Sequence, residues 1–167
     1  MPAMVTRRLS REEGHKRKFL TVIDGSPECG RAVAYAAGRA ARSNGVVVLL
    51  FVIEPGEFQH WLGVEEIMRA EAREEAEARL ATYAEEARLR FGVDPECVIR
   101  EGRLAEEINA VIDGDGDIAI LVLAASTETD GPGPLISSLA GKSGTTFHIP
   151  VTIIPGTMSD DDILGVT

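Results

Sequence analysis

Four short β-prone segments without regular polar alternation constrain the fold of this chain more than any other feature. They are Phe19–Ile23, Val46–Ile53, Ile118–Leu123 and Val151–Ile154. Strands with this pattern are buried on both faces, which is typical of a parallel sheet covered by helices on each side. A short strand at Cys97–Ile99 and helical segments between the strands complete the alternation. The sequence therefore predicts an α/β doubly wound sheet of about five parallel strands.

The ends of these strands are where a binding site is expected. Ligands of open parallel sheets lie outside the carboxyl ends of the strands, so the loop that follows Leu123 is the first candidate. The first strand ends at Asp24-Gly25-Ser26. Ser26 is a favourable N-cap and Pro27 suits the first helical position, so we expect a helix to begin there. Asp24 either acts on a ligand or accepts hydrogen bonds from its own helix start, which is the commoner role.

The longest periodic segment runs from Val64 to Phe91 and predicts a single helix that Gly92 ends. Apolar residues recur on one stripe at steps of three and four: Val64, Met68, Ala72, Ala76, Leu80, Tyr83, Ala87 and Phe91. The opposite face carries oppositely charged pairs at the supportive i,i+4 spacing: Glu65–Arg69, Glu75–Arg79 and Glu86–Arg90. We interpret these charges as a solvated helix face and not as a site.

Length and charge restrict the domain organisation and the partners. The 167 residues suffice for one domain with a substantial core. We expect a flexible basic extension over residues 1–17, one domain over 18–156, and a flexible acidic tail over 157–167. The formal net charge of -10 disfavours binding to nucleic acid or to an anionic membrane. No apolar run approaches the ~20 residues that cross a bilayer, and the N-terminus lacks a signal-peptide core, so we expect a cytoplasmic protein without membrane insertion.

The cysteines and the aspartate-rich turn offer no metal-binding pattern. Cys29 and Cys97 are isolated thiols, which we interpret as reduced and partly buried. The segment Asp113–Asp117 resembles a calcium loop only superficially, because Ile118 occupies the sixth position, where glycine is required. We therefore expect a turn there and no metal site.

Phosphate-loop and catalytic motifs are also absent from the sequence. Gly141-Lys142-Ser143 is not a Walker A motif, since Ile136 stands where the first glycine belongs, and Gly131-Pro132-Gly133 is not a dinucleotide fingerprint. The histidines are far apart: His15, His60 and His148. We expect no catalytic residue, although triads are assembled in space, and a redox or flavin-binding module on the same fold is a second class left open.

The order of these parts resembles the universal stress protein family over roughly Lys18 to Pro155. The resemblance lies in Phe-Leu-Thr-Val-Ile-Asp-Gly-Ser (19–26), Leu-Leu-Phe-Val-Ile-Glu-Pro (49–55), the long charged helix, and Ile-Pro-Val-Thr-Ile-Ile-Pro (149–155). It implies a Rossmann-like sheet of five parallel strands in the order 3-2-1-4-5 and a homodimer formed through the last strand. Ile163 and Leu164 in the tail are further candidates to dock on a partner subunit. Activity does not follow from the fold alone.

One branch of this family binds ATP through a signature of Gly, two residues, Gly, nine residues, and then Gly-Ser or Gly-Thr. Such glycines let backbone N–H groups approach phosphates, and the last pair opens a helix whose N-terminus holds an anion. Counting back from the last strand aligns the signature with Ala124, Thr127 and Ser137-Ser138, so the spacing is kept while all three glycines are replaced. The resemblance matches the adenine-side positions better, at Asp24 and Val52.

Two interpretations of this degenerate signature compete. In one, the chain is a nucleotide-dependent switch that binds ATP, with Mg²⁺ only as part of that complex. Gly131 and Gly133 then supply flexible backbone, and Ser137 and Ser138 cap the following helix; turn formation is the simpler role for both glycines. In the other, the chain is a stress-response regulatory or interaction module with an unidentified protein partner and weak or no ATP binding. We favour the second, because two lost phosphate hydrogen bonds of about 1.5–3 kcal/mol each weaken binding by roughly two orders of magnitude or more.

Overall fold

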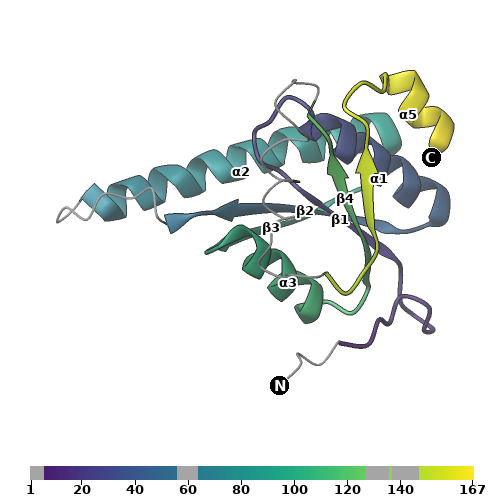
Figure 1. Ribbon diagram of the computed structural model, residues 1–167, viewed down its shortest axis with the longest axis horizontal. Coiled ribbons are helices and arrows are strands. Elements are labelled where there is room, and N and C mark those ends of the chain that lie inside the picture. Colours follow the sequence, from purple (N-terminus) through teal and green to yellow (C-terminus); the bar gives the residue numbers. More distant parts are fainter. Residues whose placement is uncertain (1–5, 56–63, 127–135, 137–146) are drawn as a thin grey trace.

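The computed structural model describes residues 6–55, 64–126, 136 and 147–167. This part of the chain forms one parallel sheet with helices on both faces (Figure 1). Its elements are β1 Lys18–Val22, α1 Cys29–Ser43, β2 Val46–Ile53, α2 Val64–Phe91, β3 Glu96–Glu101, α3 Leu104–Gly114, β4 Ile118–Ala124, β5 Val151–Ile154 and α5 Asp160–Val166. The α/β fold predicted from the alternation of apolar runs and helical segments is confirmed.

The strands lie in the order β3-β2-β1-β4-β5, and each neighbouring pair is parallel. This confirms the order 3-2-1-4-5 that the family resemblance implies. The chain adds β2 and β3 on one side of β1 and then β4 and β5 on the other. In the register, Thr21 of β1 lies opposite Leu49 of β2 and Val122 of β4. The carboxyl ends of the three central strands therefore meet at one edge of the sheet, where open α/β sheets bind ligands.

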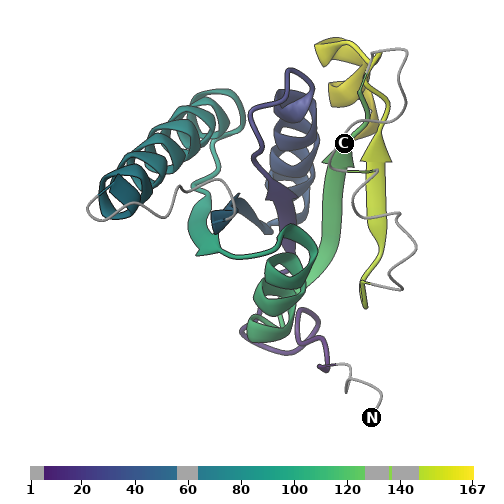
Figure 2. The same ribbon diagram turned by 60° about the vertical axis from the view of Figure 1, so that its left-hand side comes forward.

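The sheet lies between two large hydrophobic cores, one on each of its faces. On one face Phe19 and Leu49 pack with the small buried residues of α1 and with α2 and α5. On the other face Leu20 and Leu50 pack with Ile108 of α3. Successive side chains of a strand point to opposite faces, so strands covered on both sides carry apolar residues at every position. Figure 2 shows α3 apart from α1 and α2, across the sheet.

Helix α2 has the bounds that its periodicity predicts. Its buried residues belong to the second half of the helix: Ala76, Leu80, Ala84 and Ala87. The predicted i,i+4 pairs are present, with N–O distances of 3.6 Å for Glu65–Arg69, 2.9 Å for Glu75–Arg79 and 2.8 Å for Glu86–Arg90. Val64, which the apolar stripe includes, is 40% exposed because this end of α2 extends beyond the sheet (Figure 1).

The segment that precedes β1 contacts the turn between α3 and β4. Nη1 of Arg8 donates hydrogen bonds at 2.8, 3.1 and 3.0 Å to the carbonyl oxygens of Ile112, Asp115 and Ile118. The N–H of Leu9 donates to the carbonyl of Gly116 at 2.7 Å. Residues 115–117 form a turn, whereas Asp113 and Gly114, which the predicted turn also includes, are the last residues of α3. These contacts attach part of the segment for which the sequence predicts flexibility.

The C-terminal segment contains helix α5, where the sequence predicts a flexible tail. A capping box starts the helix, since Oγ of Ser159 accepts from the N–H of Asp162 at 3.1 Å and the Asp162 carboxylate accepts from the N–H of Ser159 at 3.3 Å. Ile163 is fully buried against α1 of its own chain, whereas Leu164 is 41% exposed. The capped first turn and one apolar anchor offset the entropy lost when this short segment becomes ordered.

Candidate functional site

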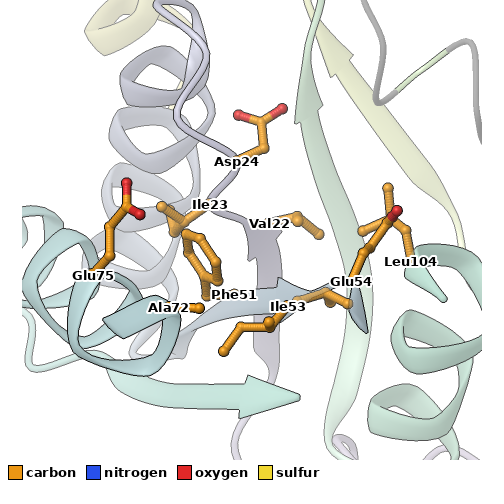
Figure 3. Close-up of a pocket in the computed structure, with 10 residues that line it drawn as sticks. Val22, Ile23, Asp24, Phe51, Ile53, Glu54, Ala72, Glu75 and Leu104 are labelled. Atoms are coloured by element: carbon orange, nitrogen blue, oxygen red, sulfur yellow. The ribbon is translucent and has the colours of Figure 1, made fainter. Parts of the chain in front are cut away.

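A pocket of about 320 Å³ lies at the carboxyl ends of β1 and β2 (Figure 3). Helix α2 and the first residue of α3 flank it. The described residues that line it are Val22, Ile23, Asp24, Phe51, Val52, Ile53, Glu54, Ala72, Glu75 and Leu104. Most of these side chains are apolar, and Figure 3 shows the carboxylates of Asp24, Glu54 and Glu75 around them. The volume is at the low end of the roughly 300–1,000 Å³ of ligand pockets, so this part of the site suits a small ring system.

The loop that follows β1 positions Asp24 at the pocket. Oδ1 of Asp24 accepts hydrogen bonds from the N–H of Ser26 at 3.0 Å and from the Ser26 hydroxyl at 2.7 Å. The prediction that Ser26 caps α1 is wrong, because Ser26 belongs to a turn that the Asp24 carboxylate closes. The helix begins at Cys29, and its N-cap residue Glu28 makes no side-chain capping hydrogen bond. Asp24 thus has the backbone-organising role that is common for aspartate in turns, while it also lines the pocket.

Gly25 lets helix α2 approach this loop closely. Its φ of 78° lies in the left-handed region, and a Cβ at this position would be 2.2 Å from Nη1 of Arg79. Arg79 also donates hydrogen bonds from Nε and Nη2 to Oε1 of Glu75, at 3.1 and 2.9 Å. The guanidinium therefore joins the β1 loop to the α2 wall of the pocket, and its charge is directed at Glu75.

A buried thiol lies beneath the loop. Cys29 is 3% exposed, and its Sγ donates a hydrogen bond of 3.6 Å to the carbonyl of Val22. Burial raises the pKa of the Cys29 thiol to about 11 and that of the neighbouring Tyr83 hydroxyl to about 12. Cys97 is exposed, in contrast to the expectation that both cysteines are partly buried. Because the thiolate is the reactive form, Cys29 is not a nucleophile at neutral pH.

The structure brings two of the predicted nucleotide-binding residues together. Asp24 and Val52 both line the pocket. Ala124 ends β4, is 8% exposed and is not among the described lining residues. The other predicted positions lie outside the described residues: Thr127, Gly131, Gly133, Ser137 and Ser138.

Sequence reasoning missed the charged residues on the pocket wall. Glu75 and Arg79 have the spacing of a solvated helix face, and nothing local distinguishes them from the other ion pairs of α2. Glu54 directly follows the last residue of β2, and Asp24 lies two residues after the last residue of β1. The position of Glu54 at the carboxyl end of a buried strand is therefore a sequence signal that could have identified it.

The pocket offers a ligand apolar contact and hydrogen-bond acceptors.

Within the described ranges, no group of three or more His, Cys, Asp or Glu side chains could hold a metal ion. His15 lies elsewhere, with its Nδ1 2.6 Å from Oδ1 of Asp117 before β4. In the same part of the chain, no helix is both long and apolar enough to span a membrane.

These features define a doubly wound, Rossmann-like α/β domain with a pocket where such domains bind ligands. The model of the universal stress protein family matches residues 16–155, and the chain belongs to this family. No curated protein sequence matches the chain.

Solved structures of universal stress proteins share the fold. UspA from Lactobacillus plantarum is 15% identical with a TM-score of 0.69, and the match covers 83% of this chain and 97% of that one. The Archaeoglobus fulgidus protein in complex with dAMP is 17% identical with a TM-score of 0.60, covering 83% and 97%. A family protein from Arabidopsis thaliana with bound AMP is 18% identical with a TM-score of 0.57, covering 83% and 91%. At these identities the likeness shows the fold alone.

Proposed function

We propose that this chain is a homodimeric stress-response regulatory module of the cytoplasm that acts through a protein partner and binds ATP weakly or not at all. The observation that carries the proposal is Ala124, which occupies the first glycine position of the family's ATP signature at the end of β4. Its side chain belongs to the hydrophobic core that includes Val122 and Ile154. A residue whose Cβ is packed in the core has less backbone freedom than the signature glycine, so its N–H is less able to approach a phosphate, and a missing hydrogen bond to a charged group costs about 1.5–3 kcal/mol.

The adenine side of the site is better preserved. Asp24 and Val52 line one pocket with an apolar floor that suits a flat base. The Archaeoglobus protein with dAMP and the Arabidopsis protein with AMP support an adenine ligand for this fold. This feature favours the second candidate function, a nucleotide-dependent switch that binds ATP with Mg²⁺.

Calorimetric titration with ATP and Mg²⁺ separates the two functions. The regulatory module predicts no measurable heat, or a Kd of hundreds of micromolar or more, because about two phosphate hydrogen bonds are lost. A Kd in the low micromolar range contradicts weak binding and establishes the switch instead.

The dimer is proposed to form through β5, an edge strand of the sheet. Val151 and Ile153 are 41% and 50% exposed and lie on the same face of that strand. An exposed apolar edge strand is a template for pairing with a second chain. We expect a dimer in sedimentation velocity and a monomer for Ile153→Asp. Leu89→Asp on α2, where the leucine is 78% exposed, is the control and stays dimeric; a monomeric parent protein refutes the assignment.

A further inference from the structure

The pocket at the carboxyl ends of β1 and β2, which we call the Asp24 pocket, has only acidic residues among its described ionisable lining residues. Its ionisable side chains are the carboxylates of Asp24, Glu54 and Glu75, and no lysine or arginine is among the described lining residues. Glu75 is neutralised by its ion pair with Arg79 at 2.9 Å. Asp24 accepts hydrogen bonds from the amide and hydroxyl of Ser26, neither of which carries a charge. In this part of the chain no ion pair joins Glu54 or Asp24, so the pocket is negative.

A phosphate chain therefore meets repulsion at this pocket. The guanidinium of Arg79 is close to the β1 loop, but two hydrogen bonds direct it to Glu75. At the end of β4 the ATP signature has Ala124 in place of glycine. The apolar floor, which includes Val52 and Leu104, attracts the base of a nucleotide without regard to the charge of the phosphates.

From this geometry we infer that the Asp24 pocket selects adenine compounds of low charge, so that affinity falls from adenosine through cAMP and AMP to ATP. The inference rests on the proposed use of this pocket by an adenine ligand and adds a ligand class to it. Among the described lining residues, the contacts with the base are common to all four compounds, and the repulsion between phosphate and carboxylate is what differs. Two uncompensated carboxylates at the mouth of a solvated pocket reduce the affinity for ATP relative to adenosine by about tenfold at moderate salt.

The experiment is a calorimetric titration of the full chain with the four ligands in the presence of EDTA, so that Mg²⁺ does not neutralise the phosphates. The ligands carry roughly zero, one, two and four negative charges at pH 8. We expect the Kd for ATP to decrease severalfold when NaCl is raised from about 50 to about 500 mM, because salt screens the repulsion. The Kd for adenosine stays constant. A site that holds phosphates through cations shows the opposite salt dependence.

Two glutamine variants test pocket carboxylates one at a time, and a third is their control. Glu54→Gln removes an unpaired charge and is expected to tighten ATP binding severalfold. Glu75→Gln also releases Arg79 toward the ligand, so its effect on ATP is larger. The matched control is Glu77→Gln on the same helix, since Glu77 is 61% exposed like Glu75 and pairs with Arg73 at the same i,i+4 spacing. The Glu77→Gln variant is expected to bind ATP and adenosine as the parent protein does. None of the three variants is expected to change the affinity for adenosine.

The outcomes separate this inference from the proposed function. ATP binding more tightly than adenosine, or weakening with added salt, overturns the selection for low charge and leaves adenine binding intact. If adenosine gives no heat, the inference is overturned while weak ATP binding still supports the regulatory module. Micromolar ATP affinity with adenosine tighter still contradicts weak ATP binding and supports the selection.

Discussion

Replacing Ile163 by alanine tests whether helix α5 is an integral part of the domain. Ile163 is 0% exposed and packs in the core that α1 shares with the sheet. Isoleucine-to-alanine changes at buried sites cost about 2–5 kcal/mol, through lost transfer free energy and the cavity that is left. Because α5 has only 7 residues and follows the last strand of the sheet, it can detach without unfolding the sheet. The loss is therefore limited to the docking free energy of α5, and we expect about 2–3 kcal/mol.

Several contacts beyond Ile163 hold this helix on α1. Nη1 of Arg39 donates to the carbonyl of Thr167 at 3.3 Å, and Nε of Arg31 donates to the carbonyl of Met158 at 3.1 Å. Gly38 permits the closest approach, since a Cβ there would be 2.7 Å from Cγ2 of Thr167. These contacts are lost together when α5 detaches, so the Ile163→Ala variant exposes the outer face of α1 as well.

Urea denaturation and native-state hydrogen exchange measure the two parts of this prediction. The midpoint falls in Ile163→Ala, and the amides of α5 exchange faster than those of the sheet strands. Leu164→Ala is the control, because Leu164 is adjacent and 41% exposed, and its expected cost is below about 0.5 kcal/mol. Equal effects of the two substitutions refute the reasoning, as does rapid exchange of the α5 amides in the parent protein.

Two further predictions concern the loop after β1. Gly25→Ala is expected to lower the free energy of unfolding by about 1–2 kcal/mol because of the left-handed φ, and by a further amount because Arg79 is displaced. Gly92→Ala is the control and has the backbone cost alone, since Gly92 has a φ of 68° and a Cβ there would have no heavy atom within 4 Å. Equal losses in urea denaturation mean that the Arg79 contact is unimportant. At pH 8 a thiol reagent is expected to modify exposed Cys97 and spare Cys29. Since burial raises the pKa of Cys29 from 9.0 to about 11, its contribution to stability is complete below pH 9 and is lost as the pH rises toward 11. Denaturation of the parent and Cys29→Ala at both ends of that range checks this, and an identical pH dependence of the two proteins contradicts it.

Most of the fold follows from local sequence pattern. The apolar runs become strands because every position of a doubly covered strand is buried, and Phe19 and Leu20 show this on opposite faces of β1. Helix α2 begins and ends where its periodicity does, at Val64 and Phe91. The start of α1 was predicted wrongly, because the N–H and the hydroxyl of Ser26 both donate to Asp24, and the sequence does not reveal whether Ser26 forms this turn or caps the helix.

The candidate site was predictable only in part. Asp24 and Val52 follow from the ends of two buried strands and from the family resemblance. Glu75 and Arg79 do not, because a charge on a helix surface becomes part of a pocket only when the helix packs beside the right loop.

The sequence by itself determined which segments are strands and helices, the parallel character of the sheet and the family, since these depend on the period and composition of short segments. Tertiary structure alone decided that α2 brings Glu75 to the β1 loop and that Ile163 anchors the C-terminal segment on α1. The physical reason is that burial and charge pairing are properties of contacts between distant segments, and a local pattern that suits solvent suits a packed surface equally well.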